Sequence, residues 1–122
     1  MFEVDLMSRI PIYEQLYRKT VELVLKGILQ EGEQLPSVRS LATELHVNPN
    51  TVAKAYSLLE RDGIVCSVAG RGSFIAKPDL LLAQEKLLGD FDTAVRRALE
   101  SGLTGEILEK RLTTLIQEGE TI

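Results

Sequence analysis

Two short apolar patterns separated by a three-residue turn constrain the fold of this chain more than any other feature. Within each pattern the apolar residues are spaced by three, one and three positions, which places them on one side of a short α-helix. The first pattern is Val38, Leu41, Ala42 and Leu45, and the second is Val52, Ala55, Tyr56 and Leu59. Because only His46, Val47 and Asn48 connect them, the helices must cross and share one core. This arrangement is a helix-turn-helix.

The ends of both helices are marked in the sequence. Ser37 is expected to cap the first helix, because its side chain accepts from free backbone N–H groups. The second helix is expected over residues 49–61, with Asn48 as its cap and Pro49 in its first turn. Gly63 then ends it, since glycine readily adopts the left-handed conformation at a helix terminus.

A short β-hairpin is expected after the second helix. Residues 64–68 and 73–76 are β-prone, and Ala69, Gly70, Arg71 and Gly72 separate them. The two glycines let the backbone approach a partner closely and leave one cation at the tip. Together with the preceding helices, the hairpin predicts a winged helix-turn-helix, a fold that places its second helix in the DNA major groove.

One helix is expected before this region. Residues 11–30 carry a helical stripe that begins after Pro11 and stops at Gly32. The stripe consists of Tyr13, Tyr17, Val21, Val24 and Ile28. It predicts a helix that packs on the core.

Two amphipathic helices are expected after the hairpin. Beyond Pro78-Asp79, apolar residues recur at helical spacing over residues 80–99 until Ser101-Gly102, and Thr104 then caps a final helix. Such a pair cannot bury both apolar faces alone, and a symmetric second copy is the simplest cover. The residues expected at that dimer interface are Leu87, Leu88, Phe91, Val95, Leu99, Leu108, Leu112 and Leu115.

The predicted fold is therefore mostly α with a small β-wing. A winged helix-turn-helix DNA-binding domain covers residues 1–77, and a helical dimerisation tail covers residues 78–122. The chain shows neither a signal peptide nor an apolar run near the roughly 20 residues of a membrane span. Its single cysteine, Cys66, excludes an internal disulfide framework. We expect a cytoplasmic protein with no membrane partner.

The charge distribution is compatible with a nucleic-acid partner, although the net charge is −4. Residues 79–122 hold five basic and nine acidic side chains, so the acidity lies mainly in the tail. Residues 36–78 hold five basic side chains (Arg39, Lys54, Arg61, Arg71, Lys77) and three acidic ones (Glu44, Glu60, Asp62). The region expected to face DNA is mildly basic, and a dimer would double that charge.

No catalytic or metal-binding pattern is present in the sequence. His46 is the single histidine and is expected to shape the turn rather than to transfer protons. Cys66 lies in a strand without an activating charge nearby, which favours a buried apolar thiol over a redox sensor. Residues 70–72 are not a nucleotide-binding motif, because a strand follows them rather than a helix. The sequence predicts neither enzyme activity nor a cofactor.

Several motif pieces occur in one order along residues 10–77. They are Gln34–Arg39, Leu41-Ala42, Val47–Val52, Ala55-Tyr56, Leu59-Glu60, Gly63 and Gly70–Phe74. In these pieces the chain resembles the GntR family of bacterial transcription regulators, and its short helical tail resembles the YtrA-like subgroup. The resemblance implies a winged helix-turn-helix, a homodimer formed through the C-terminal helices and, often, repression of a neighbouring transporter operon.

The resemblance also implies which residues contact DNA. The matching positions are Arg39, Asn48, Asn50, Thr51 and Gly70. Pro49 and Ala53 stand where other members often carry arginine, so the base preferences of those members do not transfer. Side chains near these positions that could also contact DNA are added to them. The full predicted contact set is Ser37, Arg39, Asn48, Pro49, Asn50, Thr51, Lys54, Tyr56, Gly70, Arg71 and Gly72.

Side-chain chemistry suggests a role for each of the principal contacts. Asn50 suits bidentate pairing with an adenine, and Thr51 suits a phosphate or a thymine methyl. Arg39 and Lys54 suit phosphates, and Arg71 suits a minor groove narrowed by A·T-rich sequence.

Two of these assignments have structural alternatives. Asn48 and Thr51 are also suited to capping their helix, and for Asn48 the cap is favoured. Tyr56 lies in the apolar stripe, so only its hydroxyl would be available to DNA.

The sequence thus predicts a homodimeric transcription factor, with repression favoured, on double-stranded DNA. Two-fold symmetry predicts an inverted-repeat operator with half-sites about one helical turn apart. The alternative is a winged helix used for protein contact without specific DNA binding. A small effector in the dimer groove is left open, since no polar cluster converges there.

Overall fold

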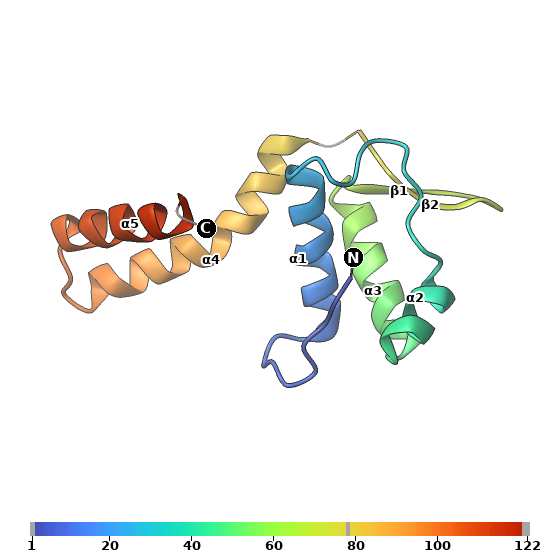
Figure 1. Ribbon diagram of the computed structural model, residues 1–122, viewed down its shortest axis with the longest axis horizontal. Coiled ribbons are helices and arrows are strands. Elements are labelled where there is room, and N and C mark those ends of the chain that lie inside the picture. The colour runs from blue at the N-terminus through green and yellow to red at the C-terminus, as the bar shows by residue number, and fades with distance from the viewer. Residues whose placement is uncertain (1, 78, 121–122) are drawn as a thin grey trace. The chain divides into compact units, whose positions relative to one another are not determined.

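The computed structural model describes residues 2–77 and 79–120, which Figure 1 shows as a ribbon. The elements are α1 (Ile12–Leu25), α2 (Val38–Leu45), α3 (Pro49–Arg61), β1 (Val65–Val68), β2 (Gly72–Ile75), α4 (Leu80–Glu100) and α5 (Gly105–Glu120). The chain divides into two compact units, Met1–Leu87 and Leu88–Ile122. Helices with one antiparallel two-stranded wing confirm the predicted fold class. None of the helices in the described ranges is long and apolar enough to cross a membrane.

The core of the first unit surrounds α3, which packs against α1, α2 and β1 (Figure 1). Its fully buried side chains come from all three helices and from the wing region: Leu16, Val21, Leu41, Val52, Leu59, Ile64 and Ile75. Burying a side chain of this kind contributes about 1.5–3 kcal/mol relative to leaving it exposed. Packing therefore fixes α3 on one side and leaves its opposite face to solvent.

Both helices of the helix-turn-helix begin where the sequence predicts. The Ser37 Oγ caps α2 by accepting from the N–H of Ser40 at 3.0 Å. The Asn48 Oδ1 caps α3 by accepting from the N–H of Asn50 at 2.8 Å, and Pro49 occupies the first helical position. These local capping signals are confirmed.

The turn and the end of α3 also agree with the sequence. His46 has φ +58° and is the only non-glycine residue with a positive φ in the described part of the chain. This left-handed residue ends α2, while Val47 packs against the core at the corner. Gly63, at φ +74°, lets the N–H of Ile64 return to the Leu59 carbonyl at 2.9 Å and close the helix.

The N-terminal helix is shorter than the predicted range 11–30, because it ends at Leu25. Gly27 has φ +74°, and the N–H of Ile28 then folds back to a carbonyl of the last turn at 2.9 Å. Gly27 rather than Gly32 therefore ends this helix. Ile28 leaves the predicted stripe and is 52% exposed.

A segment that we call the strap, residues 32–35, lies beside β2 and was not predicted. Its backbone exchanges hydrogen bonds with Ser73 at 2.9 Å and with Ile75 at 2.8 Å. Gln34 forms an antiparallel bridge with Phe74. The strap therefore joins the wing to the segment that leads into α2.

Cys66 is exposed, so the predicted buried thiol is wrong. In β1 only Val65 is buried, and its cross-strand partner Ile75 is buried as well. Side chains alternate along a strand, and Cys66 therefore faces away from the core that covers Val65. A wing of two strands offers no second layer to cover that face.

The first turns of α4 belong to the first unit. Ala83 is fully buried in its core, and the Lys86 ammonium lies 3.7 Å from the Asp62 carboxylate. The first compact unit thus ends at Leu87, ten residues after residue 77, where the predicted DNA-binding domain ends. Pro78, part of that predicted boundary, lies outside the described residues.

The second unit is the predicted helical hairpin. Gly102 adopts φ +100° after α4, and the Thr104 Oγ1 accepts from the N–H of Ile107 at 3.3 Å, which confirms the predicted stop and cap. No residue of α5 is buried. Apolar side chains of both helices line an open groove of about 520 Å³ that includes Phe91 and Leu112. This unit therefore leaves much of its apolar surface exposed.

Candidate nucleic-acid interface

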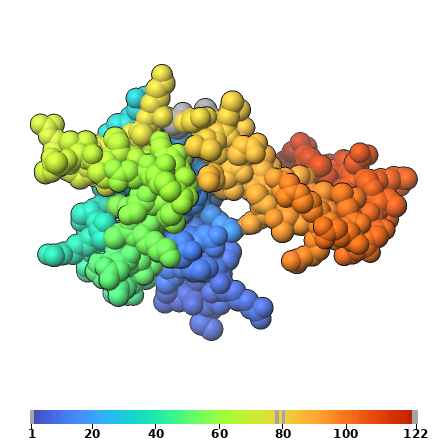
Figure 2. Space-filling model, turned by 180° about the vertical axis from the view of Figure 1, so that it is seen from behind, coloured from blue at the N-terminus to red at the C-terminus, as the bar shows by residue number. Residues whose placement is uncertain are grey.

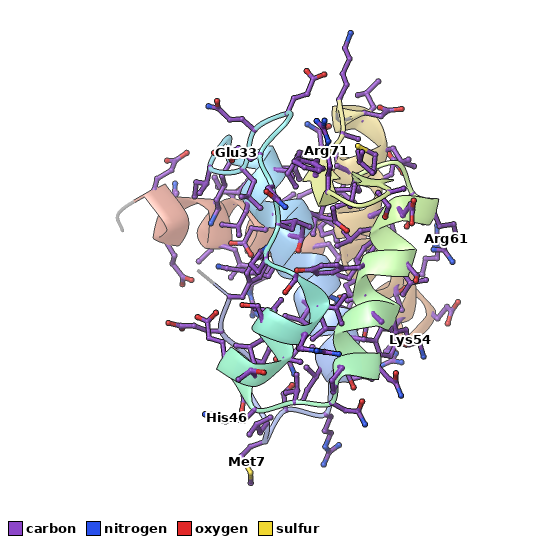
Figure 3. The ribbon with its side chains drawn as sticks, turned by 90° about the vertical axis from the view of Figure 1, so that its right-hand side faces the viewer. Met7, Glu33, His46, Lys54, Arg61 and Arg71 are labelled. Carbon is purple, nitrogen blue, oxygen red and sulfur yellow. The ribbon has the colours of Figure 1, made fainter. Side chains whose placement is uncertain are left out.

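The exposed face of α3 carries polar and basic side chains. Asn50, Lys54, Ser57 and Arg61 are all exposed and recur at helical spacing opposite the buried stripe. In Figure 3, Lys54 and Arg61 lie along the same outer side of the helix. Ser57 was not among the predicted contacts, although its position between Lys54 and Arg61 in the helical repeat would have indicated it.

The N-terminus of α3 separates capping from recognition. Asn48 uses its side-chain oxygen to accept from the N–H of Asn50, so that oxygen is committed to the helix. The Asn50 side chain itself is exposed, and Thr51 is half-buried. The backbone N–H groups of this turn are used within the helix, because that of Thr51 donates to the Asn48 carbonyl at 2.9 Å and Pro49 has none. This end of α3 can therefore offer the exposed Asn50 side chain to a nucleic acid.

The start of α2 adds a cation and a second helix N-terminus. Ser37 is exposed, but its oxygen is used as the cap. Arg39, in the first turn, is exposed, and its carbonyl accepts from the Thr43 hydroxyl at 2.9 Å. The Arg39 guanidinium is thus carried on a short, well-capped helix.

Lys54 has a partner that sequence reasoning missed. Its Nζ lies 4.0 Å from the centre of the Tyr13 ring, and such contacts contribute about 0.5–1 kcal/mol at exposed sites. Tyr13 was assigned only to the core stripe, yet its half-buried ring holds the lysine beside α1. The contact restricts Lys54 without neutralising its charge.

The wing presents Arg71 at its tip. Gly70 and Gly72 have φ values of +75° and +113°, and the N–H of Arg71 donates to the Val68 carbonyl at 2.9 Å. Arg71 is exposed and forms no ion pair within the described ranges. The Arg71 carbonyl accepts from the Gln34 Nε2 at 2.7 Å. The cation is therefore free, while the backbone that carries it is held.

Tyr56 is committed to the interior of the first unit. It is 7% exposed, and its hydroxyl donates to the Pro36 carbonyl at 2.6 Å. Burial raises the pKa of Tyr56 to about 12. This contact fixes the start of α2 relative to α3, and it uses the hydroxyl that the sequence predicts to be available to DNA.

Asp62, at the end of α3, collects several partners. Its carboxylate accepts from the Tyr17 hydroxyl at 2.5 Å and pairs with Arg61 at 3.1 Å and with Lys86 at 3.7 Å. The hydrogen bond from Arg61 is the main cause that lowers the pKa of Asp62, and Tyr17 and Lys86 add to it against the effect of burial. Burial, then the bond to Asp62, raises the pKa of Tyr17 well above its usual value.

The predicted contacts from α2 and the wing lie on one side of the first unit. In Figure 2 the wing, in yellow-green, projects from the same side as α2, in turquoise, and Figure 1 shows both on the same side of α1. The exposed N-terminus of α3 adjoins α2 through the turn. The structure therefore brings Arg39, Asn50 and Arg71 onto elements that can face one partner.

Comparison with known sequences gives a consistent result. Residues 12–75 match the family of bacterial regulatory proteins, gntR family. The chain is 52% identical over 77 residues to the HTH-type transcriptional repressor YtrA of Bacillus subtilis, a match that covers 63% of this chain and 59% of that relative. It is 35% identical over 112 residues to the uncharacterized HTH-type transcriptional regulator YhcF of the same organism, covering 89% and 93%.

Solved structures are similar over different shares of the chain. A transcriptional antiterminator from Listeria monocytogenes EGD-e superposes with a TM-score of 0.73 at 36% identity, covering 97% of this chain and 91% of its own. The DNA-binding domain of AraR, solved in complex with operator ORX1, superposes with a TM-score of 0.53 at 26% identity, covering 62% and 93%. The first similarity thus extends over the helical tail as well as the winged helix.

Proposed function

We propose that this chain is a homodimeric transcription repressor that binds an inverted-repeat operator. The chain belongs to the GntR family of bacterial regulatory proteins and is a DNA-binding transcription regulator rather than an enzyme. The observation that carries the proposal is the shared orientation of α2, the N-terminus of α3 and the wing, each with an exposed polar or basic side chain. We place its action in the cytoplasm, where its DNA lies.

Each half-site would be contacted by three parts of one subunit. Asn50 and Thr51 enter the major groove with the N-terminus of α3, and Asn50 reads an adenine. Arg39 and Lys54 neutralise phosphates. Arg71 enters the flanking minor groove, where a narrow A·T-rich segment attracts arginine.

The remaining predicted contacts support these residues. Ser37, Asn48 and Pro49 build the helix N-termini that carry Arg39 and Asn50. Gly70 and Gly72 give the tip its backbone shape.

Dimerisation is proposed from the apolar surface of the α4–α5 hairpin. Its exposed side chains include Leu87 (39%), Leu88 (44%), Phe91 (47%), Leu99 (49%), Leu112 (41%) and Leu115 (54%), and the half-buried Val95 and Leu108 complete the predicted interface. Exposed apolar side chains in such number mark an interaction site, and a second copy would cover them with the same residues. Two subunits would also double the number of phosphate contacts.

Repression is proposed because the relative with 52% identity is named a transcriptional repressor. The resemblance to the YtrA-like subgroup extends the proposal to a small transporter operon near the gene. In transcription in vitro, the purified protein should lower the amount of transcript made from the promoter upstream of its own gene. A higher amount of transcript with the protein than without it would contradict repression.

Arg71→Ala tests the DNA-binding mode. We expect this change to weaken operator binding by about 1–3 kcal/mol, the range for one good contact to a base edge. The measurement is a titration of labelled upstream DNA at fixed salt. Unchanged affinity would contradict a role for the wing tip, and failure of the wild-type protein to shift any upstream fragment would favour a protein partner instead.

Leu112→Asp and Phe91→Asp test the dimer. A carboxylate in the apolar groove is costly to bury, so both variants should be monomers with weak operator binding. Thr113→Asp is the matched control, because Thr113 is exposed on the same helix and does not line that groove. Light scattering reports the mass, and a dimer of either groove variant would overturn the assignment.

A further inference from the structure

The wing tip is held by a side chain that lies far from it in the sequence. The Gln34 Nε2 donates to the Arg71 carbonyl at 2.7 Å, across 37 positions of the chain. Gln34 comes from the strap, whose backbone is paired with β2 on both sides of this residue. The amide is thus delivered to the tip from a fixed backbone rather than from a free loop.

The tip is shaped to receive this amide. Gly72 has φ +113°, and a Cβ placed on it would lie 2.9 Å from the Gln34 Nε2. A side chain at position 72 would therefore both strain the backbone and displace the amide. Glycine at this position leaves room for Gln34 against the Arg71–Gly72 peptide.

Apart from this amide, the tip is held by the bond from the Arg71 N–H to the Val68 carbonyl at 2.9 Å and by the pairing of Gly72 with Val68. Gly70 and Gly72 flank Arg71, and glycine has the largest backbone freedom of any residue. Among the described residues, Gln34 provides the only side-chain hydrogen bond to the backbone of residues 69–72. The carbonyl that it holds belongs to Arg71 itself, so the bond restricts the direction in which the Arg71 side chain leaves the wing.

We propose that Gln34 is a positioning residue for DNA recognition, whose amide fixes the Arg71–Gly72 peptide and aims Arg71 at the minor groove. This inference rests on the proposed function of the wing. It adds a residue outside the predicted contact set, from a segment that the sequence assigned to no element. The strap also continues into Ser37 and α2, so one short segment sets both the wing tip and the start of α2.

A double-mutant cycle with Arg71 tests the proposal on the full-length protein. Gln34→Ala should weaken binding to the upstream DNA roughly threefold to tenfold, the range for one hydrogen bond that orders a contact. In an Arg71→Ala background the same change should have no further effect, because the side chain that it positions is gone. Gln34→Glu should weaken binding at least as much, since a carboxylate cannot donate to the carbonyl.

Gln30→Ala is the matched control. Gln30 is an exposed glutamine five residues after the end of α1, and its amide faces the Gly27 carbonyl at 3.4 Å rather than the wing. It should bind DNA like the wild type. Full affinity of Gln34→Ala, or losses that add to those of Arg71→Ala, would overturn the proposal.

Two further readouts separate positioning from a general structural effect. Exchanging A·T for G·C pairs in the operator flanks should weaken the wild type, but should have little effect on Gln34→Ala or Arg71→Ala. In the free protein, ¹⁵N relaxation should show lower order parameters at residues 70–72 of Gln34→Ala. Unchanged order would overturn the inference even if no operator were known. Absence of wild-type DNA binding would instead refute the proposed function, and with it the role of Gln34 in recognition, but not the fixing of the peptide.

Discussion

Replacing Asp62 with alanine tests how the first unit holds its parts together. The Asp62 side chain is 10% exposed and accepts from the Tyr17 hydroxyl of α1. It also pairs with Lys86 of α4 and with Arg61 of α3. Three helices therefore meet at a single carboxylate, and removing it should release all of these contacts together.

The size of the effect follows from the partners. A hydrogen bond between a partly buried hydroxyl and a charged acceptor contributes about 1.5–3 kcal/mol. The Lys86 side chain is 40% exposed, so its pair with Asp62 at 3.7 Å adds about 0–1 kcal/mol. The Arg61 side chain is 63% exposed, so its pair with Asp62 is screened by solvent and adds little. We expect Asp62→Ala to lower the free energy of unfolding by about 1.5–4 kcal/mol.

The assay is urea denaturation of the full-length protein at pH 7, followed by circular dichroism. Glu60→Ala is the matched control, because Glu60 is an exposed carboxylate two positions earlier in the chain. Its effect should stay within about 0.5 kcal/mol. Tyr17→Phe should add little to Asp62→Ala, since both remove the same hydrogen bond. A loss below about 0.5 kcal/mol for Asp62→Ala would refute the reasoning.

The dependence on pH gives a second check of the same contacts. The pKa of Asp62 lies below its unfolded value of about 4, chiefly because of the hydrogen bond from Arg61. A carboxylate with a lowered pKa stabilises the fold above the unfolded pKa, and that contribution is lost as the pH falls through the folded pKa. The stability difference between wild type and Asp62→Ala should therefore be full at pH 7 and shrink below pH of about 4. A difference that stays constant down to pH of about 2 would contradict this linkage.

Two further predictions concern DNA binding and alkaline pH. Lys54→Ala should reduce the slope of log affinity against log salt by about 1, and an unchanged slope would exclude Lys54 from the phosphate contacts. Tyr17 has a raised pKa, so its neutral form stabilises the fold below the unfolded value of about 10, and the contribution is lost as the pH rises above it. The melting temperature of Tyr17→Phe should therefore fall less steeply than that of the wild type as the pH rises above about 10. Equal falls in the two melting temperatures would contradict this expectation.

The helix-turn-helix could be predicted from the sequence because its signals are local. Ser37 and Asn48 act on N–H groups two or three residues away, and the apolar spacing repeats within one or two turns. The C-terminus of α1 was less predictable, since either Gly27 or Gly32 could end the helix and only the packing of the chain selects Gly27. The predicted burial of Cys66 was wrong because alternation indicates that a strand has two faces but not which of them the core covers.

The contacts that set the candidate interface were the least predictable. The bond from Gln34 to Arg71 and the one from Tyr17 to Asp62 span 37 and 45 positions, and no periodic pattern links their partners. The contact between Lys54 and Tyr13 likewise joins residues assigned separately to DNA and to the core. Each of these contacts involves a polar or aromatic group whose neighbour is known only after the helices pack.

These long-range contacts divide the first unit into the proposed DNA-contact surface and the residues that support it. Asn50, Arg39 and Arg71 are exposed and have no structural task for their end groups among the described contacts, as expected for groups that a ligand will satisfy. Gln34 and Tyr56, by contrast, donate their polar hydrogens to backbone carbonyls of the wing tip and of the segment before α2. Substitutions in the first set should therefore change DNA affinity without changing stability. Substitutions at Tyr56 should change both, since its ring is core and its hydroxyl fixes α2 against α3.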